Sequence, residues 1–256
     1  MTAKDIWDAK VYLQFEDERL RPALDLIARI PHEAPKLVVD LGCGAGNALP
    51  VLAARFPGAR VMGVDGSAAM LVKAAAAGFE TAQAEISTWA PAAPVDVIFS
   101  NAALQWLDGH EALFPRLLEC LAPGGVLAVQ MPSMHAAPLR AEQDRIAREG
   151  PWAEVLQRVK SAPPILSPEA YYAMLSPRVA KLEMWVTEYI HVMRGEDPVL
   201  RWAMGTSLRP YLDALGPEGS RGFLAAYAAA MRAAYPPGPD GAVLLPFRRL
   251  FVLARR

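Results

Sequence analysis

Hydrophobic positions in the first half of the chain fall into short runs that are separated by polar or glycine-containing turns. Within each run apolar residues follow one another without strict alternation, which is typical of a strand buried on both faces of a parallel sheet. The predicted strands cover residues 37–40, 60–65, 79–84, 95–100 and 126–131. The run at 79–84 is the weakest of them.

The segments between these runs have helical periodicity. Residues 48–56 and a segment that begins at Ser67 predict helices, and residues 109–121 place four leucines on one stripe. Pro123-Gly124-Gly125 predicts a helix stop and a turn. Strands that alternate with helices indicate a parallel, doubly wound sheet with helices on both faces.

After residue 132 the regular alternation of predicted strands and helices ends. Helices are expected over 138–176, with interruptions at Pro151 and Pro163-Pro164, and again over 197–235. Residues 180–193 and 246–254 read as two further strands that would pair as an antiparallel arm. We therefore predict an α/β fold with a seven-stranded, mostly parallel, doubly wound sheet and a C-terminal helical cap insertion.

Three regions follow from this organisation. Residues 1–30 are expected to form an N-terminal helical segment over the active site, and residues 31–135 the α/β core that binds the cofactor. Residues 136–256 would supply the remaining strands and the inserted helical cap. A long insertion on a rigid sheet favours a role in specificity.

Charge and composition exclude several classes of function. The 256 residues carry a net charge of −1, so no electrostatic footprint for nucleic acid or for an anionic membrane is expected. Two cysteines cannot build a disulfide framework or a four-cysteine metal site, and no metal is expected. The start of the sequence lacks a signal-peptide core and no apolar run is long enough for a membrane helix, which favours a cytoplasmic protein. A monomer or weak homodimer is expected.

The strongest candidate for chemistry is the turn after the first predicted strand. The strand ends in Asp40, and Gly42, Gly44 and Gly46 follow before a helix, as at nucleotide-type cofactor sites. The third position of the dinucleotide fingerprint is Asn47 rather than glycine, which disfavours a dinucleotide. Asp40 suits a cationic amino-acid moiety. An acid at the end of the second strand could accept both ribose hydroxyls of NAD or of S-adenosylmethionine.

Several motifs together carry a family resemblance. VVDLGCGAGN, MGVDGS, AEI, VDVIFSNAALQWL and LAPGGVLAVQMP are similar, in sequence and order, to the class I S-adenosylmethionine-dependent methyltransferases. The resemblance implies that fold and S-adenosyl-L-methionine as the cofactor, with S-adenosyl-L-homocysteine as the product. By resemblance the glycine turn lies against the methionine part, and the acid of MGVDGS holds the ribose. The cofactor-binding residues expected on these grounds are Asp40, Gly42, Gly44, Gly46, Asp65, Gly66, Met70, Glu85, Ile86, Asn101 and Ala102. Glu85 stands where the family often has aspartate, whose side chain is one methylene shorter and by resemblance contacts the adenine amino group.

Segments near the two ends of the chain indicate which members of this family it resembles. The N-terminal WDAKVYLQFEDERLRPALDLIARI and the C-terminal GEDPVLRWAMGTSLRPYLDAL, AAYPPGPDG and PFRRLFVLA resemble the members of the family that esterify one carboxylate of a small polycarboxylic acid. A carboxylate is already an ionised nucleophile near neutral pH. No catalytic side chain is therefore expected beyond those that align the reactants.

Other functions remain open from the sequence. The acceptor could be a malonyl group on a carrier protein, although the balanced charge offers no basic docking patch. A quinone or sterol ring would need a base and an apolar pocket. A non-catalytic module that binds S-adenosylmethionine, or a nicotinamide oxidoreductase, would keep the glycine turn but transfer no methyl group.

To bind a small polycarboxylate, the protein needs several cationic or hydrogen-bonding groups. Arginine is well suited because it binds a carboxylate through two parallel hydrogen bonds. The expected substrate-binding residues are Tyr12, Gln105, Trp106, Arg209, Tyr211 and Arg248. Alternation along a strand sends Arg248 and Arg249 to opposite faces, so one of them would enter the pocket; Arg248 is favoured and Arg249 is expected to be solvated or salt-bridged. Neutral donors, namely Tyr12, Gln105, Trp106 or backbone amides, would hold the reacting carboxylate, because a tight arginine pair would lower its nucleophilicity.

Overall fold

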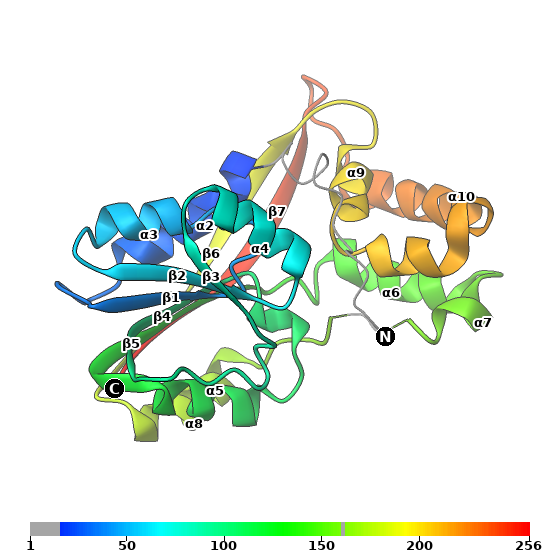
Figure 1. Cartoon of the computed structure of the whole chain (residues 1–256). Coiled ribbons are helices and arrows are strands. Elements are labelled where there is room, and N and C mark those ends of the chain that lie inside the picture. Colours follow the sequence, from blue (N-terminus) through cyan, green and yellow to red (C-terminus); the bar gives the residue numbers. More distant parts are fainter. Residues whose placement is uncertain (1–15, 160–161) are drawn as a thin grey trace. The chain divides into compact units, whose positions relative to one another are not determined.

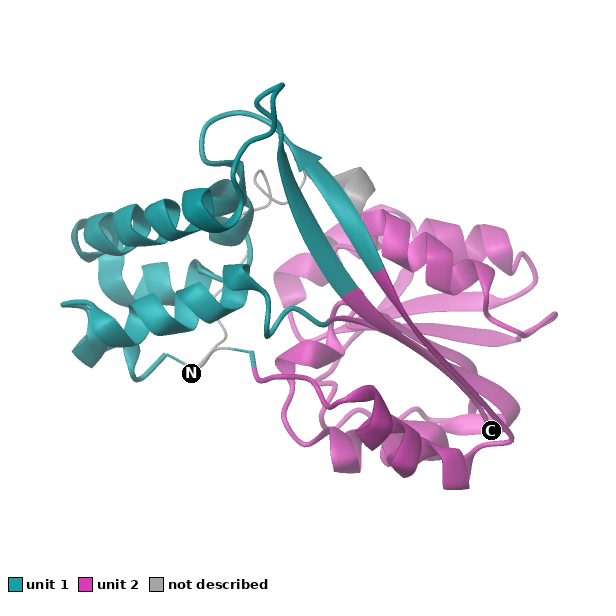
Figure 2. Ribbon diagram, turned by 180° about the vertical axis from the view of Figure 1, so that it is seen from behind, with its two compact units in different colours: residues 1–16, 133–162, 188–248 teal, residues 17–132, 163–187, 249–256 magenta. Residues whose placement is uncertain are grey.

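The computed structural model describes residues 16–159 and 162–256, which fall into two compact units (Figure 2). The helical unit comprises residues 1–16, 133–162 and 188–248, and the sheet unit residues 17–132, 163–187 and 249–256. The predicted C-terminal region 136–256 thus contributes to both units. Within the described ranges no helix combines the length and the apolar character that a membrane span requires.

A seven-stranded sheet runs in the order β3-β2-β1-β4-β5-β7-β6 (Figure 1). Its strands are β1 Leu37–Leu41, β2 Arg60–Asp65, β3 Glu80–Gln83, β4 Val95–Asn101, β5 Leu121–Pro132, β6 Lys181–Met193 and β7 Val243–Arg255. The pairs from β3 to β5 are all parallel, whereas β7 is antiparallel to β5. This mixed sheet confirms the predicted fold class.

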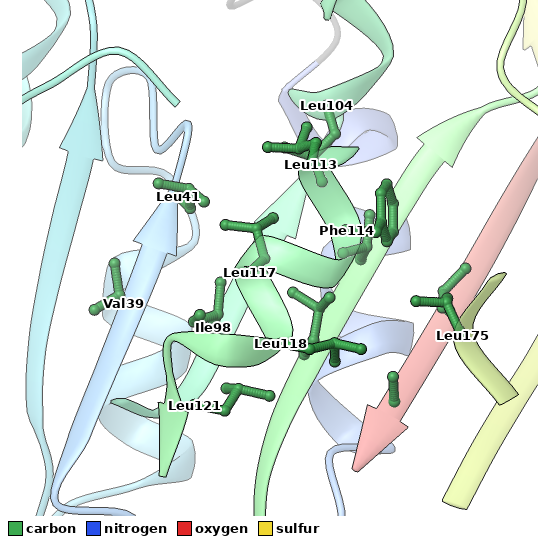
Figure 3. Packing of buried hydrophobic residues seen from close by; sticks show 14 of the residues in the cluster. Val39, Leu41, Ile98, Leu104, Leu113, Phe114, Leu117, Leu118, Leu121 and Leu175 are labelled. Carbon is green, nitrogen blue, oxygen red and sulfur yellow. The ribbon is translucent and has the colours of Figure 1, made fainter. Parts of the chain in front are cut away.

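Helices cover both faces of the parallel part of the sheet. They are α2 Glu16–Ala28, α3 Leu49–Arg55, α4 Ala68–Ala76, η1 Leu104–Trp106, α5 His110–Glu119, α8 Pro168–Leu175 and η2 Ser176–Arg178. Figure 1 shows α2 and α3 on one face and α5 and α8 on the other. The leucine stripe of α5 is buried on β1 and β4 (Figure 3). Three of the four leucines of the predicted stripe, Leu113, Leu117 and Leu118, thus lie in α5, whereas the fourth, Leu121, begins β5 because the helix ends at Glu119.

The turn predicted at Pro123-Gly124-Gly125 lies inside a strand. Strand β5 begins at Leu121, which pairs with Val95, and the register then shifts so that Val97 pairs with Val126. The extra residues form a bulge, for which the positive φ of Gly124, 78°, is suited. The sequence therefore identified the irregularity but not the strand that continues through it.

The helical unit contains α6 Pro138–Glu149, α7 Ala153–Leu156, α9 Pro198–Met204 and α10 Arg209–Ala234. Its core is built around buried aromatic residues that include Trp202, Phe223 and Tyr227. The predicted helical stretch 197–235 is interrupted between α9 and α10, and α10 is kinked at Gly216, whose φ is 67°. Proline at the next position explains why the helix does not continue straight.

Candidate cofactor and substrate site

The glycine turn after β1 is folded back on β2. The backbone N–H groups of Gly42 and Cys43 donate to the carbonyl of Val64, at 2.7 and 3.0 Å. Gly42, Gly44 and Gly46 have φ values of 81°, 55° and 84°, in the region that favours glycine. This backbone path therefore explains why glycine occupies all three positions.

The three glycines differ in what surrounds them. A Cβ on Gly42 would lie 2.3 Å from the Cβ of Ala103, and one on Gly46 would lie 2.9 Å from the Cβ of Ala74 in α4. A Cβ on Gly44 would meet no atom within 4 Å. Gly42 and Gly46 therefore allow close packing inside the protein, while the space above Gly44 is open to a ligand.

Asp65, at the carboxyl end of β2, ties the turn to the start of α4. One carboxylate oxygen accepts a hydrogen bond from the N–H of Gly44 at 2.9 Å, and the other from the N–H of Ser67 at 2.8 Å. Ser67 caps the helix by accepting from the N–H of Met70. The carboxylate is half-buried beside the open turn, where it is placed to accept hydroxyl groups of a ribose.

Asp40 is 2 % exposed at the end of β1. Burial in the sheet, and then the negative charge of Asp65, raise its pKa from 3.8 to about 8. Both causes oppose ionisation, so a cationic group bound nearby would favour the charged form. The electrostatics of the turn therefore suit a positively charged amino-acid moiety.

Residues expected around the adenine also meet at this edge of the sheet. A Cβ on Gly66 would lie 3.0 Å from Oε1 of Glu85, and the side chain of Ile86 reaches to 3.1 Å from the corresponding position at Gly42. The backbone carbonyl of Ile86 is held by the guanidinium of Arg116 in α5. The loops after β2 and β3 are thereby joined to the glycine turn.

The loop after β4 has a strained start. Ala102 has a φ of 54°, which costs a residue with a Cβ about 1–2 kcal/mol, and its N–H donates to the carbonyl of Gln130 at 2.9 Å. The Gln105 amide nitrogen donates to the Ala102 carbonyl at 2.7 Å. Oδ1 of Asn101 and Oε1 of Gln105 are buried without a hydrogen-bond partner among the described residues. Trp106 is 40 % exposed.

A buried histidine holds this loop in place. His110 Nε2 donates to the carbonyl of Leu104 in η1 at 2.9 Å, which leaves Nδ1 to accept from the hydroxyl of Tyr171 in α8 at 2.5 Å. Burial raises the pKa of the Tyr171 hydroxyl above its usual range, so it stays protonated and can donate. No local pattern in the sequence links these two residues, because they lie 61 positions apart in the chain.

The substrate-binding residues predicted in the helical unit have partners of their own. Arg209 Nε pairs with Asp213 Oδ1 at 3.1 Å on the surface of α10. The buried Tyr211 stacks on Phe223 and donates to Asp144 at 3.3 Å. Tyr211 also lines a cavity of about 640 Å³ with residues of α6 and α7. Tyr12 lies outside the described residues.

The structure reverses the expected burial of the two arginines in β7. The side chain of Arg248 is exposed, whereas Arg249 is 4 % exposed and its Nη1 donates to Oε1 of Gln130 at 3.2 Å. Of the two alternatives expected for Arg249, solvated or salt-bridged, its burial rules out solvation. Pairing of Arg249 with Pro132 in the β5–β7 register determines this, because it places the side chain on the face that Gln130 shares.

Gln130 was not among the predicted site residues. It is fully buried in β5, and its Nε2 has no hydrogen-bond partner within the described ranges. A polar residue inside the apolar run VLAVQM was the available signal, since a buried amide needs partners.

Comparisons with known proteins agree with this geometry. Residues 12–177 match the methyltransferase domain family. The chain is 48 % identical over 255 residues to a trans-aconitate 2-methyltransferase of Methylobacterium radiotolerans, and 48 % identical over 254 residues to one of an Azoarcus species. The alignments cover 98 % of this chain and 98 % and 99 % of the two relatives.

Solved structures share the fold at low sequence identity. The YcgJ protein of Bacillus subtilis superimposes with a TM-score of 0.57 at 15 % identity, over 92 % of this chain and 98 % of that one. A phosphoethanolamine N-methyltransferase of Haemonchus contortus does so with a TM-score of 0.53 at 17 % identity, over 91 % of this chain and 52 % of that one. Together with the glycine turn and the strand order, the family match and the full-length relatives show that the chain belongs to the methyltransferase domain family and is closely related to the trans-aconitate 2-methyltransferases.

Proposed function

We propose that the protein is an S-adenosylmethionine-dependent O-methyltransferase that forms a methyl ester on one carboxylate of trans-aconitate. The observation that carries this proposal is the 48 % identity over 98 % of the chain, which includes the helical unit as well as the cofactor turn. An acceptor is recognised by residues outside the general cofactor motifs, so likeness along the whole chain bears on the substrate as well as on the fold.

The residues at the glycine turn fit S-adenosylmethionine. The open side of Gly44 leaves room for the ligand against the backbone, Asp65 offers a carboxylate to the ribose, and the buried Asp40 favours a nearby cation. When bound, this cofactor supplies a methyl group on a sulfonium sulfur, from which an incoming carboxylate oxygen displaces a neutral thioether. We assign Gly66, Met70, Glu85, Ile86, Asn101 and Ala102 to the same site, as the resemblance implies.

The protein need not supply a general base for this reaction. The acceptor carboxylate is ionised near neutral pH, so the side chains only have to bind it, orient it and exclude water. Orientation of two reactants can contribute about 7–11 kcal/mol to lowering a barrier. We keep Tyr12, Gln105, Trp106, Arg209, Tyr211 and Arg248 as proposed contacts to the acid.

The direct test uses the purified full-length protein with S-adenosylmethionine and trans-aconitate. We expect one equivalent of monomethyl ester for each S-adenosylhomocysteine formed, measured by mass spectrometry, and little ester with citrate or with the cis isomer. Tight binding of S-adenosylhomocysteine without transfer to any carboxylate would instead indicate a non-catalytic module. Transfer to a malonyl-carrier protein but not to free acids would overturn the proposed acceptor.

A further inference from the structure

Four polar side chains lie across neighbouring strands of the sheet unit. They are Asp40 in β1, Asn101 in β4, Gln130 in β5 and Arg249 in β7. Three are almost completely buried, with exposed fractions of 2 % for Asp40, 0 % for Gln130 and 4 % for Arg249. Burial of a polar group in a sheet core is costly unless it is satisfied, so the amide nitrogen of Gln130, which has no hydrogen-bond partner among the described residues, needs an explanation.

The strand register places all four on one face. Asp40 pairs with Phe99, and Asn101 is two residues further along β4. Asn101 pairs with Gln130, and Arg249 pairs with Pro132, two residues beyond Gln130. Residues directly opposite each other, or two apart on a strand, share a face of a sheet. The row therefore begins at the cofactor turn and leads away from it.

Charge changes along the row from acidic through neutral to basic. Asp40 is beside the glycine turn, the two amides of Asn101 and Gln130 follow, and the guanidinium of Arg249 is the member farthest from β1. Strands lie about 4.8 Å apart, so Gln130 and Arg249 are one and two strand spacings from Asn101. A cationic methyl donor bound near Asp40 and an anionic methyl acceptor bound toward Arg249 would match this change in charge.

The contact between Arg249 and Gln130 fixes the orientation of the amide. Arginine can only donate, so the atom 3.2 Å from its Nη1 must be the carbonyl oxygen of Gln130. The amide nitrogen then points elsewhere, and no described residue accepts from it. The pair thus presents a buried N–H donor next to a permanent positive charge, a combination that suits a carboxylate.

We propose that Gln130 and Arg249 bind a carboxylate of the acceptor other than the one that is methylated, and that this contact selects polycarboxylic acids. The assignment rests on the proposed function. The amide of Gln130 donates to the carboxylate and Arg249 supplies the charge that holds it there. Because this pair lies away from the glycine turn, the carboxylate near Asn101 remains free of an arginine partner and keeps its nucleophilicity.

The test compares acids that differ by one carboxylate. Mesaconate and glutaconate each correspond to trans-aconitate with one carboxylate removed, and we expect the wild type to use at least one of them much less well. In Arg249→Lys and Gln130→Glu, kcat/KM for trans-aconitate should fall about tenfold or more while that for the poorer diacid changes little. The wild-type preference for the triacid should shrink by the same factor. Binding of S-adenosylhomocysteine, measured by calorimetry, should stay within about twofold.

Arg255→Lys is the matched control, since Arg255 is on the same strand with an exposed side chain. Gln130→Met keeps the length of the side chain and removes its N–H. This variant should therefore also lose the preference for the triacid, even if the buried charge in Gln130→Glu disturbs folding. Equal losses for triacid and diacids in Arg249→Lys and Gln130→Met would overturn the assignment. If the wild type methylates no polycarboxylate, the proposed function itself fails; if it does and the variants keep its preference, only this assignment fails.

Discussion

At the scale of single residues, the glycines of the cofactor turn have different tasks. Gly42 and Gly46 allow backbone to pack against Ala103 and Ala74, and Gly44 leaves an open surface. The alternating pattern in the sequence does not separate these tasks, because all three residues have positive φ. Substitution by alanine should separate them.

We predict different outcomes for alanine at two of these positions. Gly46→Ala should lower the free energy of unfolding by about 2–4 kcal/mol, because its Cβ would clash with α4 and its φ is left-handed. Gly44→Ala should cost only about 1–2 kcal/mol of stability but weaken binding of S-adenosylmethionine about tenfold or more. Urea denaturation and calorimetry measure the two effects. Equal stability losses without a difference in binding would contradict the division of tasks.

Asp40 gives a pH-dependent prediction. Its pKa of about 8 in the folded protein is above the value of 3.8 for an exposed carboxyl, so between these values the folded state holds a proton that the unfolded state has lost. Its contribution to stability is therefore complete at low pH and is lost as pH rises through about 8. Without ligand, Asp40→Asn should become progressively more stable relative to wild type between pH 5 and 8. If the free energies of unfolding of the wild type and of Asp40→Asn changed with pH in parallel, the raised pKa of Asp40 would be refuted.

At the scale of elements, the loop after β4 depends on support from a distant helix. The side chain of His110 joins η1 to α8 through Leu104 and Tyr171. Phe114 packs against Tyr171 with ring centroids 5.1 Å apart, so the link lies in the core of the sheet unit. A loop that starts with the strained Ala102 is thus held by buried hydrogen bonds.

Tyr171→Phe should lower the free energy of unfolding by about 1–3 kcal/mol, because Nδ1 of the buried His110 loses its donor. Tyr172→Phe is the matched control: Tyr172 is the next residue in α8 and is 62 % exposed, so its loss should be within about 0.5 kcal/mol. Chemical denaturation of both variants measures the difference. A similar stability for the two would show that the His110 contact contributes little.

At the scale of the whole molecule, the proposed function divides the work between donor and acceptor residues. Asp65→Ala should raise the KM for S-adenosylmethionine about tenfold or more, with a much smaller effect on the KM for the acid, because it removes a charged hydrogen-bond acceptor at the turn. Asp65→Asn, which keeps one oxygen, should have an intermediate effect.

Arg209→Ala should show the reverse pattern, a raised KM for the acid and a nearly unchanged KM for the donor, if Arg209 contacts the acceptor as proposed. Asp213→Ala removes only its surface partner and is the control. Steady-state kinetics with each substrate varied in turn gives both constants. Equal effects of Asp65→Ala and Arg209→Ala on the two constants would contradict the division.

Local patterns in the sequence were enough to predict the order of the elements and the cofactor turn. Strands of a parallel sheet are buried on both faces and read as apolar runs, and Asp40, Gly42, Gly44 and Gly46 are neighbours in the chain. The fold class and the methyltransferase family followed from these local patterns. Local sequence was sufficient because strand, turn and helix start are continuous here.

The polar residues that meet far from that turn could not be predicted from local patterns, because they come from distant parts of the chain. Arg249 and Gln130 are 119 residues apart, and His110 and Tyr171 are 61 apart, so strand register and helix packing bring each pair together. Alternation in β7 showed that one of two adjacent arginines would be buried, but only pairing with β5 selected Arg249. Register is a property of two strands at once, and a shift of one residue would have reversed the choice.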